Sequence, residues 1–267
     1  MYPVLFKVGN FVVYSYGLTM ALGFIVAFGW VFQEARRSGE NLDDYYNVCL
    51  IAMVGGIVGA KLLYVIVNFG EFRTHLLMVL NLREGGLVWY GGVLTVVPLL
   101  WLYTRIKKIS FYHMTDILSA PVAAGLGVGR IGCLMSGCCY GCKTNLPWGI
   151  RYPYDPNDPH SILLPEELRG IRVHPSPVYE MLAVFAIAGI LAYLNRTKTI
   201  DGQPTWAFFL LYGFARFILE YFRGDAARGF LFDGLLSVSQ FISLILIIVS
   251  AVMLLRLDKK RVTAVTG

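Results

Sequence analysis

The sequence predicts an all-α integral membrane protein of about seven transmembrane helices. Of its 267 residues, 57% are hydrophobic and only 15% are charged, whereas soluble domains average about 25% charged residues. The mean hydropathy is +0.61. Long apolar runs alternate with polar segments, and a helix of roughly 20 residues spans the hydrocarbon core of a bilayer. We therefore expect one membrane domain covering residues 1–267.

Seven apolar runs are the candidate spans. They cover residues 11–34, 45–68, 87–104, 114–139, 176–195, 205–222 and 232–256. Residues 1–10 lack the basic region and the small-residue cleavage site of a secretory signal peptide, so we expect the first span to be retained. Segment 140–175 is rich in Pro and Asp, and predicts an external cap loop rather than a second domain.

The distribution of Lys and Arg predicts that the N-terminus faces outward and the C-terminus inward. In that orientation, short cytoplasmic segments hold eleven cations, whereas short outer segments hold five. The net charge of +6 does not indicate nucleic-acid binding, because no basic block is interleaved with aromatic residues. The eleven cytoplasmic cations are Arg36, Arg37, Arg105, Lys107, Lys108, Arg196, Lys198, Arg256, Lys259, Lys260 and Arg261.

Three cations lie inside the candidate spans: Lys61, Arg130 and Arg216. A charge at the bilayer centre costs on the order of 2.5 to 3.5 kcal/mol on insertion scales, so each needs a partner. With the N-terminus outside, all three share one depth in the outer half of the bilayer. The remaining spans place three more polar residues at that depth, namely Tyr16, Tyr90 and Glu180.

In the sixth span, Tyr212, Arg216 and Glu220 are four residues apart and share one helix face. One interpretation is structural, with Arg216 paired to Glu220 and Arg130 snorkelling outward. The other is that nearby carboxylates do not neutralise all three cations and an anionic ligand completes the layer. A guanidinium matches phosphate oxygens bidentately, which favours a phospholipid head group.

The fourth span is rich in glycine between Gly125 and Gly137. Glycines four residues apart favour close helix contact, and glycines around Arg130 would also let a ligand approach the backbone. A phosphate-binding P-loop is excluded, because no Gly-Lys-Ser/Thr follows and the segment is not a strand-to-helix turn.

Several motifs together resemble one family. The signature of the bacterial prolipoprotein diacylglyceryl transferases is similar to one segment of this chain, Gly129-Arg130-Ile131-Gly132 followed by Ser136-Gly137 and Tyr140-Gly141. Other similar segments occur in the same order over almost the whole chain: Tyr16-Gly17-Leu18, Gly91-Gly92, His174-Pro175-Ser176 with Tyr179-Glu180, and Tyr212-Gly213 to Arg216, Glu220 and Arg223.

The resemblance implies transfer of diacylglyceryl from phosphatidylglycerol to the lipobox cysteine of a prolipoprotein, or to another thiol acceptor, with release of glycerol phosphate. It implies a bacterial cytoplasmic (inner) membrane protein whose site faces the exterior or periplasm, with no cofactor, metal or nucleic acid. The candidate catalytic residues are Arg130, Arg216, Tyr90, Cys133, Cys138 and Cys139. The candidate substrate-binding residues are Tyr16, Lys61, Gly129, Gly132, Gly137, Glu180, Tyr212, Glu220 and Arg223.

This chain departs from the family pattern at several of these positions. Tyr90 stands where the family has His, and a phenol with a reference pKa of about 10 is a poor base at neutral pH. Lys61 stands where Arg is common. Cys133 replaces an Asn and Cys138 a Glu, so that four cysteines, Cys133, Cys138, Cys139 and Cys142, gather at the outer end of the fourth span.

The cysteine cluster has a structural and a functional interpretation. A disulfide, or inert small residues at a helix end, would suit an oxidising exterior. Alternatively, a thiol activated by Arg130 could act in redox or nucleophilic chemistry, or the thiols could bind a soft metal. A zinc site with four thiolates is disfavoured, because its usual pattern is two separated pairs.

Three function classes follow. The leading one is a diacylglyceryl transferase. The alternative is a divergent member that uses its cysteine cluster for thiol redox, sulfur or metal handling at the outer face of the membrane. An anion transporter is disfavoured, because the sequence has no inverted repeat and no charged path to the cytoplasmic side.

Overall fold

The computed structural model describes residues 4–9, 11–72, 86, 88–152, 169–224, 229–231 and 235–266. The chain divides into two compact units. The first contains residues 1–30 and 115–267, and the second contains residues 31–114. Each is described by itself.

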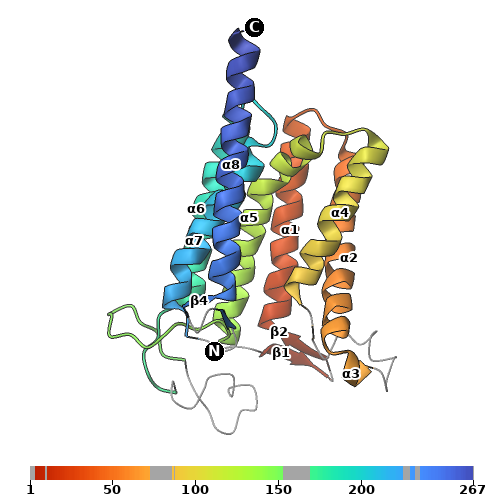
Figure 1. Cartoon of the computed structure of the whole chain (residues 1–267). Helices are drawn as coiled ribbons and strands as arrows, with labels where there is room; N and C mark the ends of the chain where they lie inside the picture. Colours follow the sequence, from red (N-terminus) through yellow and green to blue (C-terminus); the bar gives the residue numbers. More distant parts are fainter. Residues whose placement is uncertain are drawn as a thin grey trace. The chain divides into compact units, whose positions relative to one another are not determined.

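In the described part of the chain, each of the seven predicted spans overlaps one long helix (Figure 1). Five of these, α1, α2, α5, α6 and α8, are long and apolar enough to cross a membrane. The helices are α1 (Ser15–Arg37), α2 (Leu42–Val67), α4 (Trp89–Lys107), α5 (Phe111–Ser136), α6 (Ser176–Thr197), α7 (Gln203–Leu219) and α8 (Val238–Thr266), with a short α3 (Phe69–Phe72) after α2.

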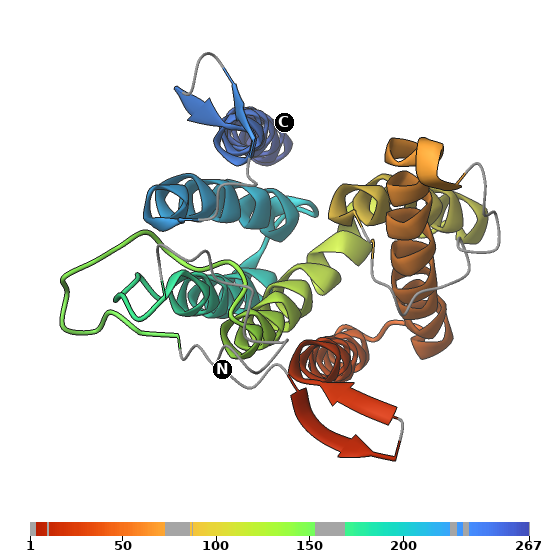
Figure 2. The same ribbon diagram turned by 90° about the horizontal axis from the view of Figure 1, so that it is seen from below.

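Two short β-hairpins stand where two of the predicted spans begin (Figure 2). The first predicted span begins at residue 11, but Phe11–Tyr14 forms strand β2, antiparallel to β1 (Val4–Val8). The last predicted span begins at residue 232, but α8 starts at residue 238, after the pair β3 (Phe230–Leu231) and β4 (Leu236–Ser237). Valine, phenylalanine and tyrosine are both apolar and prone to strands, so hydropathy alone cannot separate these strands from the helices that follow.

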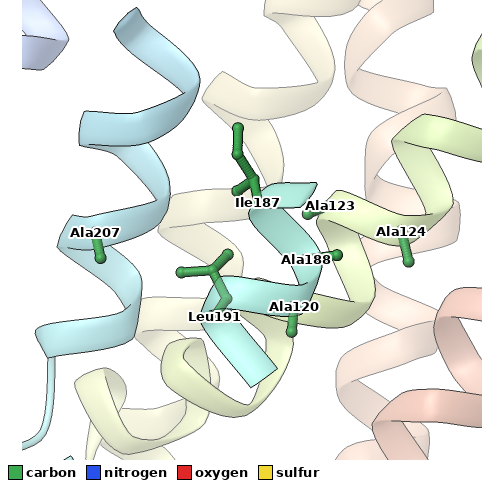
Figure 3. Close-up of a cluster of buried hydrophobic side chains, with 7 residues drawn as sticks. All are labelled: Ala120, Ala123, Ala124, Ile187, Ala188, Leu191 and Ala207. Atoms are coloured by element: carbon green, nitrogen blue, oxygen red, sulfur yellow. The ribbon is translucent and has the colours of Figure 1, made fainter. Parts of the chain in front are cut away.

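The core of the first unit lies between α5, α6 and α7 (Figure 3). Small side chains from α5, Ala120, Ala123 and Ala124, face larger ones from α6, including Ile187 and Leu191. Small residues let helices pack closely where lipid rather than water surrounds them. The close packing fixes where the polar ends of these helices lie.

At the N-terminal end of α5, Asp116 joins three segments of the first unit. Its side chain is fully buried and accepts hydrogen bonds from Lys198 Nζ at 2.8 Å, Gly202 N at 2.8 Å, and Thr205 N and Oγ1 at 3.0 and 2.6 Å. Gly202 and Thr205 stand at the start of α7, where backbone N–H groups have no helical partner. Asp116 therefore caps α7 and compensates the charge of Lys198.

At the other end of α5, loop segments around 140–144, 172–174 and 222–224 are joined by backbone hydrogen bonds. Gly141 N donates to His174 O at 3.0 Å, and Cys142 N donates to Phe222 O at 2.9 Å. Tyr140 O accepts from Gly224 N at 3.1 Å. The described ends of the predicted cap, 140–152 and 169–175, thus form an ordered framework, and residues 153–168 of that prediction lie outside the described residues.

In the second unit, α2 packs along α4. Tyr103 of α4 donates a hydrogen bond to Asp44 Oδ1 of α2 at 2.7 Å.

We predict that Asp116→Ala lowers the free energy of unfolding by about 3 to 5 kcal/mol, the typical cost of breaking a buried ion pair, because it also removes the acceptor of the buried donors of Gly202 and Thr205. Thermal unfolding of the purified protein in detergent measures the effect. Asp201→Ala is the control, since Asp201 is the half-exposed second partner of Lys198 and its loss should shift the melting temperature much less. Equal shifts in the two variants would contradict the role given to Asp116.

Candidate functional site

Arg130 lies near the C-terminal end of α5 and pairs with a carboxylate from α6. Its Nη2 atom is 2.5 Å from Glu180 Oε1, and Glu180 is 8% exposed. A buried carboxylate needs a charge partner, and Arg130 supplies it. The Arg130 side chain remains 22% exposed, so the guanidinium is also within reach of a ligand.

Arg216 is the second arginine of the site. Its Nη2 atom is 2.8 Å from Glu220 Oε2 and donates to Ser239 Oγ of α8 at 3.1 Å. The predicted pairing with Glu220 is therefore confirmed. Its other terminal nitrogen, Nη1, is buried and has no hydrogen-bond partner among the described residues. A buried donor without a partner carries a desolvation cost, and a ligand could relieve it.

Tyr212 connects the two arginines. It lies one helical turn before Arg216 on α7, and its hydroxyl is hydrogen-bonded with Arg130 and within electrostatic range of both guanidinium groups and Glu180. Three elements of the first unit, α5, α6 and α7, thus bring Arg130, Glu180, Tyr212 and Arg216 together.

Two of the three cations inside the predicted spans have a carboxylate partner in the structure. Arg130 and Arg216 each have a carboxylate partner, so these two cations are neutralised locally. The case for an anionic ligand therefore rests on the unused donors, above all Arg216 Nη1, and not on an excess of bare charge. Each guanidinium has five N–H donors, more than one carboxylate can accept.

A cluster of three thiols lies beside Arg130, and two of its sulfur atoms contact the guanidinium. The sulfur atoms of Cys133, Cys138 and Cys139 are all within 4.8 Å of one another. Arg130 Nη1 is 3.8 Å from Cys133 Sγ and 3.9 Å from Cys139 Sγ. All five cysteines of the chain are free thiols. Cys142 stands apart from the cluster, because its thiol donates to Tyr221 O at 4.0 Å.

A reversal of the backbone after α5 brings Cys139 back to Arg130. Gly137 has φ +73° and Cys139 has φ +58°. The left-handed region is open to glycine but is costly for a residue with a side chain. Cysteine at position 139 therefore keeps its sulfur in the cluster at the expense of backbone strain.

The two thiols outside the helix differ in acidity. The pKa of Cys139 is lowered, because the thiols of Cys133 and Cys138 donate hydrogen bonds to its sulfur and because Arg223 and Arg130 stabilise the thiolate. The pKa of Cys138 is raised, because the neighbouring sulfurs of Cys133 and Cys139 and partial burial all favour its protonated form. The negative charge of the cluster is thus centred on Cys139.

Two more predicted residues lie beside this cluster. Tyr16, at the start of α1, is within electrostatic range of all three thiols and of Arg130. Arg223 is similarly placed toward Cys139, and its backbone forms a bridge with Gly141.

The glycines of the predicted signature have packing explanations. A Cβ atom on Gly132 would lie 2.0 Å from Thr19 Oγ1, so glycine lets α5 approach α1. Gly129 lies beside Met20, also in α1, and Gly137 makes the turn described above. Their roles in substrate binding stay predictions.

Lys61 and Tyr90 belong to the second unit. Lys61 is 6% exposed, and its Nζ atom lies over the rings of Tyr64 and Phe72, at 5.6 and 5.7 Å from their centroids. The partner of this buried cation therefore includes aromatic faces, which attract ammonium groups. Tyr90 is 43% exposed. Their roles in the reaction stay predictions from the resemblance.

Sequence reasoning missed two residues at the site. Ser239 at the start of α8 binds Arg216, and Tyr152 is 5% exposed within electrostatic range of the three thiols. A serine among apolar residues near a span end is a weak indication of such a role. Tyr152 stands in a polar loop, where no periodic pattern indicates burial.

Comparisons with known proteins identify the family of this chain. A family model described as prolipoprotein diacylglyceryl transferase matches residues 3–256. The chain belongs to this family. A phosphatidylglycerol–prolipoprotein diacylglyceryl transferase of Clostridium tetani is 34% identical over 93% of this chain and 95% of the relative. Proteins of the same name from Clostridioides difficile and Geobacter sulfurreducens are 33% and 32% identical, covering 92% and 97% of this chain and 91% and 96% of the relatives. Family membership makes this chain a membrane transferase.

We predict that Cys139 is the first thiol of the cluster to react with an alkylating reagent, and that its labelling continues below the usual thiol pKa of about 8.5. Its lowered pKa keeps it a thiolate as the pH falls, whereas Cys138 stays protonated as the pH rises. Mass spectrometry of the protein labelled with iodoacetamide between pH 5.5 and 9 measures both. Preferential labelling of Cys138 at low pH would contradict this order.

Proposed function

We propose that this protein transfers diacylglyceryl from phosphatidylglycerol to the lipobox cysteine of a prolipoprotein, with Arg130 and Arg216 binding the donor phosphate. The observation that carries the assignment is that Tyr212 lies between the two arginines. The Nη1 atom of Arg216 is buried and has no hydrogen-bond partner among the described residues. A phosphate oxygen is the acceptor that such a donor lacks. The names of the relatives identify the reaction class.

The reaction replaces a carbon–oxygen bond by a carbon–sulfur bond. The acceptor sulfur attacks the phosphate-bearing carbon of the diacylated glycerol, the bond from that carbon to the phosphate oxygen breaks, and glycerol phosphate leaves with the electron pair. Charge grows on the phosphate as the bond breaks. Guanidinium groups held in place before the reaction stabilise this charge without reorganising, which supplies several kcal/mol in comparable sites.

The acceptor must lose its thiol proton in the same site. A free thiol has a pKa near 8.5, and nearby cations favour its thiolate. Arg130, Arg216 and Arg223 provide such cations, so the acceptor sulfur can be activated by the electropositive surroundings. Participation of Cys133, Cys138, Cys139 and Tyr90 in the chemistry stays a prediction; its support is the contact of two of these sulfurs with Arg130.

The carboxylate partners of Arg130 and Arg216 determine which substitutions can test the role of these arginines in catalysis. Removing Arg130 leaves Glu180 buried and unpaired, so an alanine variant would confound catalysis with folding. Arg130→Lys and Arg216→Lys keep one positive charge for each carboxylate but lose bidentate binding of phosphate.

We predict that each lysine variant lowers kcat by about 100-fold or more, in line with the loss of one preorganised donor, while the melting temperature changes little. Arg223→Lys is the matched control and should be milder. Incorporation of radiolabelled phosphatidylglycerol into a lipobox peptide by purified protein measures the rate, and restored lipoprotein modification in cells depleted of their own enzyme tests the function. Wild-type rates in both lysine variants would make these arginines structural.

We further propose seven spans, an outward N-terminus and a site at the outer face of the bacterial inner membrane. The excess of cations in the segments assigned to the cytoplasm supports this topology. A phospholipid donor and a secreted acceptor would then meet at one surface.

We predict that a cysteine-independent tag inserted in the 140–175 loop reports the exterior, and that a tag after Arg256 reports the cytoplasm. Reporter fusions active on only one side of the membrane measure this. A cytoplasmic result from the loop would reverse the proposed topology.

A further inference from the structure

The thiol cluster has the form of a metal site, which is one of the alternatives that the sequence left open. Three sulfur atoms from Cys133, Cys138 and Cys139 lie within 4.8 Å of one another. In a trigonal site with metal–sulfur bonds of about 2.3 Å, the sulfur atoms are about 4.0 Å apart. The sulfurs therefore need to close by less than about 1 Å to bind one ion in common.

The burial of the three thiols and the charge beside them also suit a bound metal ion. Cys133 is buried and the other two thiols are half-buried, so bound metal would be shielded from water. Three thiolates and one monovalent ion carry a net charge of −2. Arg130, which touches two of the sulfurs, offsets part of that charge.

The donor set selects the kind of ion. Thiolates are soft ligands and favour Cu(I). Structural zinc takes four ligands, and Cys142, the next cysteine along, has its thiol directed to Tyr221 O. Among the described residues, the cluster of ligand atoms that includes these sulfurs has three members.

We propose that Cys133, Cys138 and Cys139 form a three-thiolate site that binds one soft monovalent metal ion, with Cu(I) as the matching ion. The strained backbone at Cys139 fits this assignment. Glycine is the preferred residue at a left-handed backbone position. A metal bond to the Cys139 sulfur would compensate for the less favourable backbone of a cysteine there.

Metal binding would also affect catalysis, in so far as the proposed function holds. The guanidinium that would face the metal–thiolate cluster is the one proposed to bind the donor phosphate. A net negative cluster beside Arg130 would compete with that phosphate. Bound Cu(I) should therefore raise the KM for phosphatidylglycerol more than it lowers kcat.

The test is Cu(I) binding by the full-length protein in detergent, without substrate, under anaerobic conditions with a reductant that is not a thiol. Cu(I) is supplied as its bicinchoninate complex, and the loss of that colour counts the ions transferred. We expect one Cu(I) per chain. Cys139→Gly, which suits the backbone at this position, should weaken binding at least 100-fold without lowering the melting temperature, and Cys138→Ser should weaken it similarly.

Cys142→Ser and Cys49→Ser are the matched controls and should retain wild-type affinity. The three-thiolate site would be overturned by any of three results: the wild-type protein takes up no Cu(I), Cys139→Gly takes it up as the wild type does, or Cys142→Ser loses Cu(I) binding. Stoichiometric Zn²⁺ binding without Cu(I) binding would overturn the choice of ion. Because binding is measured without substrate, failure of the proposed transferase activity leaves this result intact, and the reverse also holds.

Discussion

The structure of the first unit depends on compensating charge inside an apolar helical bundle. Arg130 on α5 and Glu180 on α6 are each costly to bury alone, and together they hold the two helices at one height. Arg216 and Glu220 repeat the arrangement at the end of α7. Because both arginines are fixed by carboxylates, their remaining donors are oriented before any ligand arrives. The stabilising pairs and the donors proposed for a ligand therefore belong to the same two arginine side chains.

Helix α5 carries polar clusters at both ends and a core of small apolar residues between them. Asp116 caps α7 near one end, and Arg130 meets the thiols near the other. The two residues are fourteen positions apart, about 21 Å along a helix. Between them, alanines of α5 belong to the same apolar cluster as residues of α6. The packing of one helix thus determines the spacing between a structural cluster and a functional one.

The sequence predicted those site residues whose side chains are costly to bury in an apolar span. Arg130, Arg216 and Glu220 stand out because charges are rare in apolar spans, and the spacing of Arg216 and Glu220 identified their pairing. Pairing of Arg130 with Glu180 was not identified, because the two residues are on different helices and no spacing rule connects them. The hairpins were missed because strand and helix residues are equally apolar here. Burial of Asp116 and Tyr152 depends on loops whose path the sequence does not show.

The three sulfur atoms of the thiol cluster come from only seven consecutive residues, 133–139, and one helix end with its turn brings them together. Closing so short a loop has a small entropic cost and needs few contacts from the rest of the chain. Ion pairs such as Arg130–Glu180 instead require two helices that are far apart in sequence. Transferring this one short segment into a relative without these cysteines would therefore transfer the cluster. A few substitutions within the segment would be enough to create or remove it.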